Sequence, residues 1–288
     1  MVQNLVQGFS IPIQIVEQSI FSKTGVFTDC EDSIYIGENY IAVIDGTTSK
    51  SDRKWNTITS GKFGSEFIGK LFSSFQKDLT ARKAVDIMTN EIQRIYKEKK
   101  LTQVVEQNPS ERINVTFIAV NLFRREIWLV GDCQAIIDKQ LLTNNTKIDH
   151  VLSETRALFL ESEILLGKSI EELLVKDVGR EFILPLLERQ SLFQNQVGLD
   201  GYWYSTLDGF HVPDEAIIIK KITEDTKSII LASDGYPVLL DSLEASENAL
   251  REILNNDPLL FREVKSTKGM ITGQISFDDR AYVKVRFG

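Results

Sequence analysis

The chain has 288 residues, of which 42% are apolar, so it can bury a substantial core and is not expected to be disordered. Its 41 acidic residues outnumber 33 basic ones, and the net charge of −8 is the opposite of the basic surface typical of nucleic-acid binding. The two cysteines, Cys30 and Cys133, are too few for a disulfide framework. From the negative net charge we expect no nucleic-acid partner.

The first residues, MVQNLVQGFSIPIQIVEQSIF, lack the basic start and long apolar run of a secretion signal. No stretch approaches the roughly 18 consecutive apolar residues that a membrane span needs. The expected location is therefore the cytoplasm, without a membrane partner.

Hydrophobic periodicity divides the first half of the chain into strands and helices. Alternating apolar residues predict a strand at 11–15 and a hairpin with strands at 33–37 and 40–44. Apolar residues at helical spacing predict helices at 58–75 and 81–99. A meander of three strands is then expected at 113–122, 126–130 and 135–138.

The second half of the chain has a less regular pattern. Residues 149–189 are mostly helical in pattern, with breaks near Gly167 and Gly179, and 194–213 is irregular and rich in glycine and aromatic residues. Further strands are expected at 216–220, 228–232 and 281–287, and further helices at 242–255 and 258–264.

This order of elements predicts the fold class. Consecutive strands with short turns favour antiparallel pairing, and long helices in separate blocks must cover the faces of a sheet. We therefore predict an α+β fold with a central antiparallel β-sandwich flanked by helix layers. Residues 1–288 are interpreted as one domain, with 139–215 as a possible flap or inserted subdomain.

Carboxylates stand at five places where predicted strands begin or end. These places are Glu31-Asp32, Asp45-Gly46, Gly131-Asp132, Asp234-Gly235 and Asp278-Asp279. Aspartate is unfavourable in strands, and its burial costs desolvation free energy. The preference of turns for Asp-Gly explains any one place, but only two of the five are Asp-Gly and two put acids side by side. Together they point to a functional cluster.

Clustered carboxylates repel one another unless cations neutralise them. Hard oxygen ligands suit Mg²⁺ or Mn²⁺. The chain has only two histidines, His150 and His211, and neither is near the acidic groups in sequence. The sequence therefore predicts a Mn²⁺ or Mg²⁺ site and no zinc site.

At these residues the chain resembles the metal-dependent protein phosphatase family of type 2C. That family carries, in order, a Glu-Asp pair, an Asp-Gly after a strand, a Gly-Asp-Ser-Arg-like turn, a Ser-Asp-Gly turn and a late Asp-Asn or Asp-Asp pair. The corresponding segments here are 31–32, 45–46, 131–134, 233–235 and 278–279. The resemblance spans nearly the whole chain and implies a serine/threonine phosphatase acting on phosphoproteins or phosphopeptides.

The resemblance also implies roles for the first motifs. Asp45 would bridge two metal ions, and the carbonyl of Gly46 would bind one of them. Asp234 would complete the ligand set together with a late aspartate. Glu31 and Asp32 would act largely through metal-bound water. Asp45 and Asp234 are thus the expected catalytic residues.

The remaining motifs imply a third ion and leave one ligand open. Asp132, with Asp234, would hold a third and weaker metal ion, so that two or three ions are expected in all. The family pattern makes Asp278 the late ligand. Strand alternation favours Asp279 instead, because Ala281 and later apolar residues share its face.

The expected mechanism follows from the metal ions. Two cations flanking one water would lower its pKa and provide hydroxide at neutral pH. The hydroxide would attack phosphorus in line while the cations neutralise the phosphoryl oxygens. No covalent nucleophile from the protein is required.

Three positions depart from the family pattern on the substrate side. Thr47 stands where many relatives have histidine, Phe27 where they have a phosphate-holding arginine, and Gln134 where the turn has arginine. The substrate-binding residues therefore cannot be named from the motifs. Cations near the motifs in sequence that could replace the arginine are Lys23, Lys50 and Arg53.

Two other functions compete with this reading. The segment 43–47 resembles the Asp-x-Asp-Gly-Thr loop of haloacid-dehalogenase-type phosphatases, but Val43 stands where their nucleophilic aspartate belongs. The second alternative is a catalytically weak or inactive metal-binding regulatory module on the same fold. The aromatic run 202–204 is interpreted either as a substrate wall or as core packing. The two cysteines are interpreted as small buried residues near turns, with a redox switch at the metal centre as the alternative.

Overall fold

The computed structural model describes residues 13–48 and 53–288, which form two antiparallel sheets of five strands each. In sheet A the strand order is β1 (Ile13–Phe21), β10 (Arg280–Phe287), β9 (Ser228–Ala232), β6 (Gln134–Ile137) and β7 (Gln140–Leu142). In sheet B it is β2 (Ser33–Ile36), β3 (Tyr40–Gly46), β4 (Val115–Asn121), β5 (Glu126–Val130) and β8 (Ile218–Lys221). The predicted strand at 11–15 begins outside the described residues.

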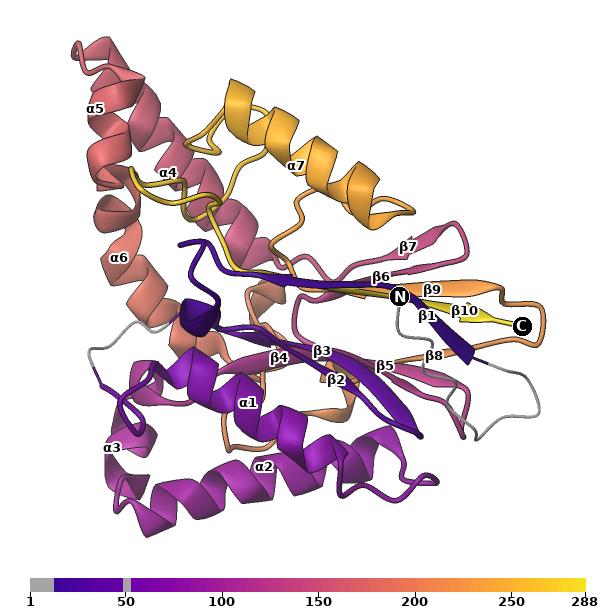
Figure 1. Ribbon diagram of the computed structural model, residues 1–288. Coiled ribbons are helices and arrows are strands. Elements are labelled where there is room, and N and C mark those ends of the chain that lie inside the picture. Colours follow the sequence, from indigo (N-terminus) through magenta and orange to yellow (C-terminus); the bar gives the residue numbers. More distant parts are fainter. Residues whose placement is uncertain (1–12, 49–52) are drawn as a thin grey trace.

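The two sheets pack face to face, as Figure 1 shows. Alternate residues of each strand point into the space between the sheets, because side chains alternate across a strand. This interior cluster is fully apolar over most of its length and includes Ile41, Val43, Ile118, Leu129, Leu231, Val283 and Val285. The predicted class, an α+β fold with a central antiparallel β-sandwich and flanking helices, is confirmed.

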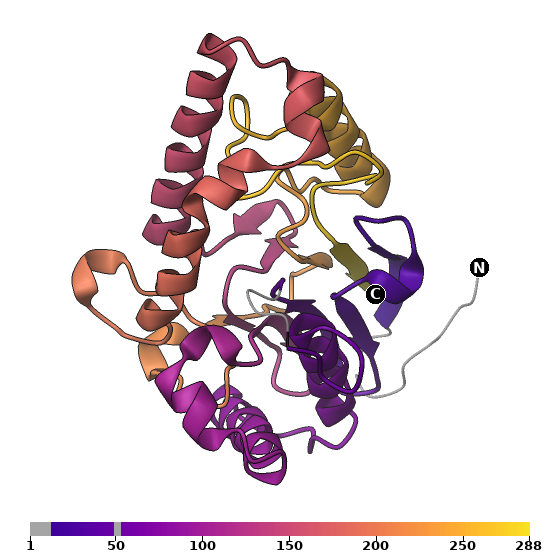
Figure 2. The same cartoon turned by 90° about the vertical axis from the view of Figure 1, so that its left-hand side faces the viewer.

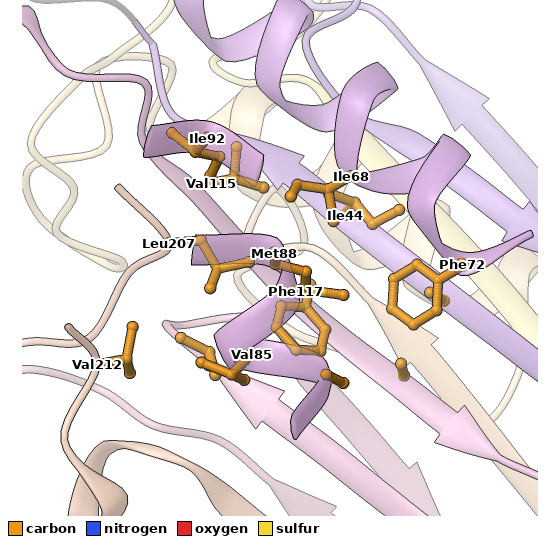
Figure 3. Close-up of a cluster of buried hydrophobic side chains, with 14 of the residues drawn as sticks. Ile44, Ile68, Phe72, Val85, Met88, Ile92, Val115, Phe117, Leu207 and Val212 are labelled. Atoms are coloured by element: carbon orange, nitrogen blue, oxygen red, sulfur yellow. The ribbon is translucent and has the colours of Figure 1, made fainter. Parts of the chain in front are cut away.

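Helices α1 (Ser60–Phe72) and α2 (Ala81–Glu98) cover the outer face of sheet B. Each begins at a threonine whose hydroxyl accepts a hydrogen bond from the first turn, Thr59 for α1 and Thr80 for α2. Their apolar stripes meet the outward residues of β3 and β4 in one buried cluster (Figure 3), which includes Ile44, Ile68, Phe72, Met88 and Phe117. The short helix α3 (Thr102–Gln107) follows.

The remaining helices are α4 (Lys147–Leu165), α5 (Ile170–Val175), α6 (Val178–Gln190) and α7 (Leu243–Asn256). Of these, α7 lies over the other side of the sandwich, whereas α5 and α6 lie beyond its left-hand end in Figure 1, next to α4 (Figures 1 and 2). Short 3₁₀ turns occur at η1 (Phe27–Asp29), η2 (Pro109–Glu111), η3 (Ser191–Phe193), η4 (Leu199–Gly201) and η5 (Asp214–Ala216). That 139–215 act as a flap stays a prediction. No helix within 13–48 or 53–288 is long and apolar enough to cross a membrane.

The predicted three-strand meander is wrong in its last strand. β4 pairs with β5 in sheet B, but β6 pairs with β9 and β7 in sheet A. The chain changes sheets at Gly131, whose φ of +97° is unfavourable for residues with a side chain. An added Cβ there would also lie 2.2 Å from the Thr116 side chain. This crossing brings Asp132 to the end of the sandwich.

The helix predicted at 258–264 is also wrong. The Asp257 carboxylate accepts hydrogen bonds from the backbone N–H groups of Phe261, Arg262 and Glu263. A side chain that satisfies these donors competes with helical hydrogen bonding, and Leu260 takes a φ of +47°. The segment is therefore a loop whose apolar residues pack inward.

Candidate metal centre

Sheet B brings two of the predicted acidic residues to one end of the sandwich, on the left in Figure 1. Asp45, near the end of β3, is paired with Thr116 of β4. Asp45 shares strand parity with Ile41 and Val43, so its side chain lies on the face between the sheets. Asp132 follows β5, and its carboxylate accepts a hydrogen bond from Thr116 Oγ1 at 3.0 Å.

Sheet A contributes acidic residues to the same end. Asp234 follows β9, and the pair Asp278-Asp279 precedes β10. The neighbouring residue Ser233 ties these segments to the Glu31-Asp32 motif, because its hydroxyl donates to Asp32 Oδ2 at 2.7 Å. The Ser233 hydroxyl oxygen also accepts a hydrogen bond from the backbone N–H of Ala281 at 2.9 Å. One serine thus links β9, β10 and the segment before β2.

Two glycines allow α1 to approach the end of β3. An added Cβ on Gly46 would lie 2.3 Å from the carbonyl oxygen of Gly61, and one on Gly61 would lie 2.5 Å from that of Gly46. No larger residue fits without moving the backbone. The glycine after Asp45 is therefore explained by this close approach, in addition to any role of its carbonyl.

The carboxylates at this end lack sufficient countercharge. Burial, then repulsion from Asp32 and Asp234, holds the pKa of Asp45 well above its usual range. Burial and the charge of Asp278 raise the pKa of Asp32, although the Ser233 hydrogen bond opposes this shift. Burial and repulsion from Asp234 raise the pKa of Asp132 to about 7.

Asp234 lies at the opening of this cluster and is exposed to solvent. The protein around it and the charge of Asp278 still raise the pKa of the Asp234 carboxyl. Asp45 and Asp132 are half-buried, whereas Glu31, Asp32 and Asp278 are buried. The cluster is therefore open at the side of Asp234.

The two late aspartates make different contacts. Asp279 accepts hydrogen bonds from the backbone N–H of Lys23 at 2.8 Å and of Glu31 at 3.2 Å, and from Lys23 Nζ at 3.2 Å. Asp278 forms ion pairs with Lys268 and, at 3.8 Å, with Lys23. Burial alone would raise the pKa of Asp278, but the two ammonium groups lower it.

The donor chemistry of this cluster fits a hard divalent cation. Its side-chain donors are carboxylate oxygens, several with raised pKa values, and Glu31 Oε1 is buried without a hydrogen-bond partner. Over 13–48 and 53–288, however, no three His, Cys, Asp or Glu side chains converge closely enough to form a ligand set. The residues fit in charge and donor type, while their side chains are not arranged as a closed coordination shell.

Several residues of this region were not singled out from the sequence. Thr116 holds Asp132, and Asp149 at the start of α4 adds a charge that acts on Asp132 and Asp234. Lys268 contacts Asp278 directly. Thr116 is found only through its strand pairing with Asp45 in the structure, and nothing in the motifs marks Asp149 or Lys268.

The cations proposed to replace the missing arginine lie in different places. Lys23 reaches the acidic cluster. Arg53 pairs with Glu111 at 2.7 Å, and Lys50 lies outside the described residues. Phe27 is 68% exposed and covers no core.

Core packing accounts for the aromatic run and the cysteines. Trp203 packs on the cluster beneath α1 and α2, while Tyr202 and Tyr204 pack against α4 and α6. Both cysteine thiols are buried and free. Burial and the charge of Asp32 raise the pKa of Cys30 to about 12, so that thiol is not reactive at neutral pH.

No family model matches the chain, and no curated protein matches it. Solved structures similar to it include the Mycobacterium tuberculosis serine/threonine phosphatase PstP/Ppp, at 14% identity and TM-score 0.49 over 96% of this chain and 98% of that one. The Staphylococcus aureus phosphatase Stp1 follows, at 14% identity and TM-score 0.47 over 99% and 98%. RsbX in complex with magnesium gives 11% identity and TM-score 0.45 over both full chains.

The first two of these structures are named as serine/threonine phosphatases, the class that the motifs resemble. With identities of 11–14% and each TM-score below 0.5, activity and substrate must be inferred from the side chains of this chain.

Proposed function

We propose that this chain is a metal-dependent phosphatase that hydrolyses phosphate monoesters, with phosphoserine and phosphothreonine proteins as its substrates. One observation carries the proposal. Carboxylates from both sheets meet at one open end of the sandwich, and their pKa values are raised. Bound cations would offset the repulsion between these carboxylates. Mn²⁺ or Mg²⁺ suits these oxygen donors.

The residues that would hold the ions are those of the motifs. Asp45, the carbonyl of Gly46, Asp234 and Asp278 are the proposed direct ligands. Asp279 is the weaker candidate for the late position, because three N–H donors already use its oxygens. When bound, divalent cations would supply Lewis acidity at the phosphoryl group and lower the pKa of a water.

The neighbouring residues position this cluster. Ser233 fixes the orientation of Asp32, and Thr116 fixes that of Asp132. The Asp279 carboxylate holds the backbone at Glu31 by accepting a hydrogen bond from the Glu31 N–H group. We assign Glu31 and Asp32 to water held at the ions, and Asp132 with Asp234 to a third and weaker ion.

The same proposal extends to organisation and location. Residues 1–288 would act as one domain, with 139–215 as a flap beside the open end, in the cytoplasm. The alternative is a metal-binding regulatory module without turnover. Two observations favour it: Phe27 replaces the expected anchor, and Asp278 is already paired with ammonium groups.

The test is hydrolysis of an aryl phosphate and of phosphopeptides with Mn²⁺, with Mg²⁺ and after chelation. We expect activity with the metals, best with Mn²⁺, and none after chelation. Asp45→Ala and Asp234→Asn should each remove most of it with the fold retained. Asp225→Asn, in the exposed turn before β9, is the matched control and should change nothing. Full turnover in chelated protein would contradict the proposal, and metal binding without turnover would favour the regulatory module.

A further inference from the structure

Two lysines bring positive charge to the late aspartates. Lys23 Nζ lies 3.3 Å from Glu31 Oε2, 3.2 Å from Asp279 Oδ2 and 3.8 Å from Asp278 Oδ1. Lys268 Nζ pairs with the other oxygen, Asp278 Oδ2. Each oxygen of Asp278 therefore has an ammonium group within ion-pair distance.

The two lysines differ in how firmly they are held. Lys23 is fixed at both ends, since its backbone N–H donates to Asp279 and its ammonium also contacts Thr48 at 3.3 Å. The ion pair that the structure gives Lys268 is to Asp278, and its side chain remains 20% exposed. Lys268 is therefore the less firmly held of the two, although its charge also lowers the pKa of the Asp234 carboxyl.

The backbone around Lys268 is anchored by helices α4 and α6. Arg156, which is fully buried in α4, pairs with Asp177 at 2.9 Å and donates to the carbonyl of Ser266 at 3.2 Å. Asp177 in turn accepts the backbone N–H of Gly269 at 2.9 Å. Arg180 of α6 donates to the carbonyl of Thr267 at 3.1 Å. The backbone at Lys268 is thus held in place, while its four-carbon side chain can change conformation.

We propose that Lys268 is a built-in competitor for the cation position at Asp278: its ammonium neutralises this carboxylate in the metal-free protein, and a divalent cation must displace it in order to bind there. The inference rests on the proposed function only in taking Asp278 as a metal ligand. A carboxylate oxygen in contact with an ammonium is not free to coordinate, and two cations at one carboxylate repel.

The first experiment compares metal affinities by calorimetric titration with Mn²⁺. Removing the competing charge in Lys268→Met should tighten Mn²⁺ binding about two- to fivefold, the range that one partly exposed ion pair contributes. Lys268→Arg keeps the charge and should show no such gain. Lys265→Met is the matched control, because Lys265 lies on the same loop but pairs with Glu154 at 2.7 Å. An affinity in Lys268→Met equal to or weaker than that of the wild type would overturn the inference.

The second experiment uses the wild-type protein, so it stands even if a variant fails to fold. Acetylation of Lys268 by a mild amine reagent is followed by mass spectrometry with and without Mn²⁺. Displacement from Asp278 should increase the rate of modification at Lys268 and leave that at Lys265 unchanged. An unchanged or slower rate at Lys268 would overturn the inference.

Neither readout requires turnover, so this inference and the proposed function can fail separately. Tighter Mn²⁺ binding in Lys268→Met together with no hydrolysis would refute the phosphatase and support the competitor. Metal-dependent hydrolysis together with unaltered affinity would support the phosphatase and refute the competitor.

Discussion

Two carboxylates near opposite ends of strand β5, the buried Glu126 and the half-buried Asp132, are in opposite electrostatic states. At its start, Glu126 accepts hydrogen bonds from Arg124 at 3.0 Å, Lys221 at 2.6 Å and the Trp128 indole at 2.9 Å. Burial alone would raise the pKa of Glu126, but these donors lower it to about 2. Beyond the other end, Asp132 has a hydroxyl donor in Thr116 and acidic neighbours, and its pKa is raised to about 7.

The difference separates a structural carboxylate from a functional one. Glu126 is satisfied by its own protein, so its charge stabilises the fold. Asp132 and the acidic residues around it destabilise the fold in the absence of a bound cation. Such uncompensated charge is characteristic of ligand sites. The start of β5 is thus held by the ion pairs of Glu126, and the Asp132 end is where we propose that cations bind.

The largest effect is expected at Asp45. Asp45→Asn should lower phosphatase activity by about 100-fold or more, since it removes a proposed bridging ligand. In chelator near pH 7.5 the same change should raise the melting temperature, because asparagine lacks the carboxyl group whose ionisation the fold opposes by raising its pKa. Each 1 kcal/mol relieved corresponds to about 2–4 °C in a protein of this size class.

The check is thermal unfolding with and without Mn²⁺. The wild type should gain stability from Mn²⁺ by binding linkage, and Asp45→Asn should lose most of that gain. A variant that melts lower than the wild type in chelator would show that Asp45 is satisfied in the apo protein, and the comparison of the two strand ends would break down.

Glu126 should behave in the opposite way. Glu126→Gln leaves Arg124 and Lys221 without a charged acceptor, so the free energy of unfolding should fall by about 1–3 kcal/mol. Mn²⁺ affinity and turnover per folded molecule should stay unchanged. Urea unfolding and calorimetry measure the two quantities, and a change in metal affinity would argue against a purely structural role.

Periodicity predicted most elements because the apolar pattern along a strand or helix is local. The hairpin, the strand 126–130, the strand 228–232 and helix 81–99 correspond closely to β2–β3, β5, β9 and α2. Which strands pair is not local, and the sheet change at Gly131 depends on a positive φ and a contact with Thr116 that no single segment encodes.

The same limit applies to the site. Its acidic residues could be found because strand ends with paired acids are unusual, and the motif order pointed to one end of the fold. Lys268 could not be found, because its position depends on Arg156 and Asp177, which lie far away in sequence. The apolar spacing of 258–264 predicts a helix, because it does not reveal that the Asp257 carboxylate accepts hydrogen bonds from the backbone N–H groups of the segment.

Asp132→Ala tests the weakest proposed metal position. It should weaken one Mn²⁺ site about tenfold or more and leave the others occupied, because Asp132 comes from a separate turn and contacts Thr116 rather than the late aspartates. Calorimetric titration resolves the sites. Loss of all metal binding would mean that Asp132 organises the whole cluster.

The pH dependence of the metal-free protein should show both ends of β5. Because the pKa of Asp132 is raised, its contribution to the free energy of unfolding is fully present below about pH 3.9, the pKa of aspartate in the unfolded chain. This contribution is lost as the pH rises through about 7. The lowered pKa of Glu126 gives a contribution that is complete above about 4.3 and is lost as pH falls towards about 2. Chemical unfolding gives the free energy of unfolding at each pH. Asp132→Asn should reduce its change near neutral pH, and Glu126→Gln should reduce its change at acid pH. If either variant left its pH range unchanged, or altered the range expected for the other, the two assignments would be contradicted.

The smallest effect concerns the substrate side of the open end, where an anchoring cation is absent at the expected position. Phe27 is 68% exposed in η1, so Phe27→Arg adds a guanidinium without disturbing a core. Lys23 is engaged by carboxylates and Arg53 by Glu111, so neither replaces that anchor without breaking an ion pair. A well-made charge-assisted pair contributes about 1.5–3 kcal/mol, and KM for phosphopeptides should therefore fall about tenfold with Mn²⁺ affinity unchanged. Val26→Arg adds the same charge one residue away and should give a smaller change. If the wild type already binds phosphopeptides tightly and Phe27→Arg weakens that binding, the missing-anchor hypothesis is wrong, and the phosphate site must be built from other residues, of which the segment 198–211 is the first to test.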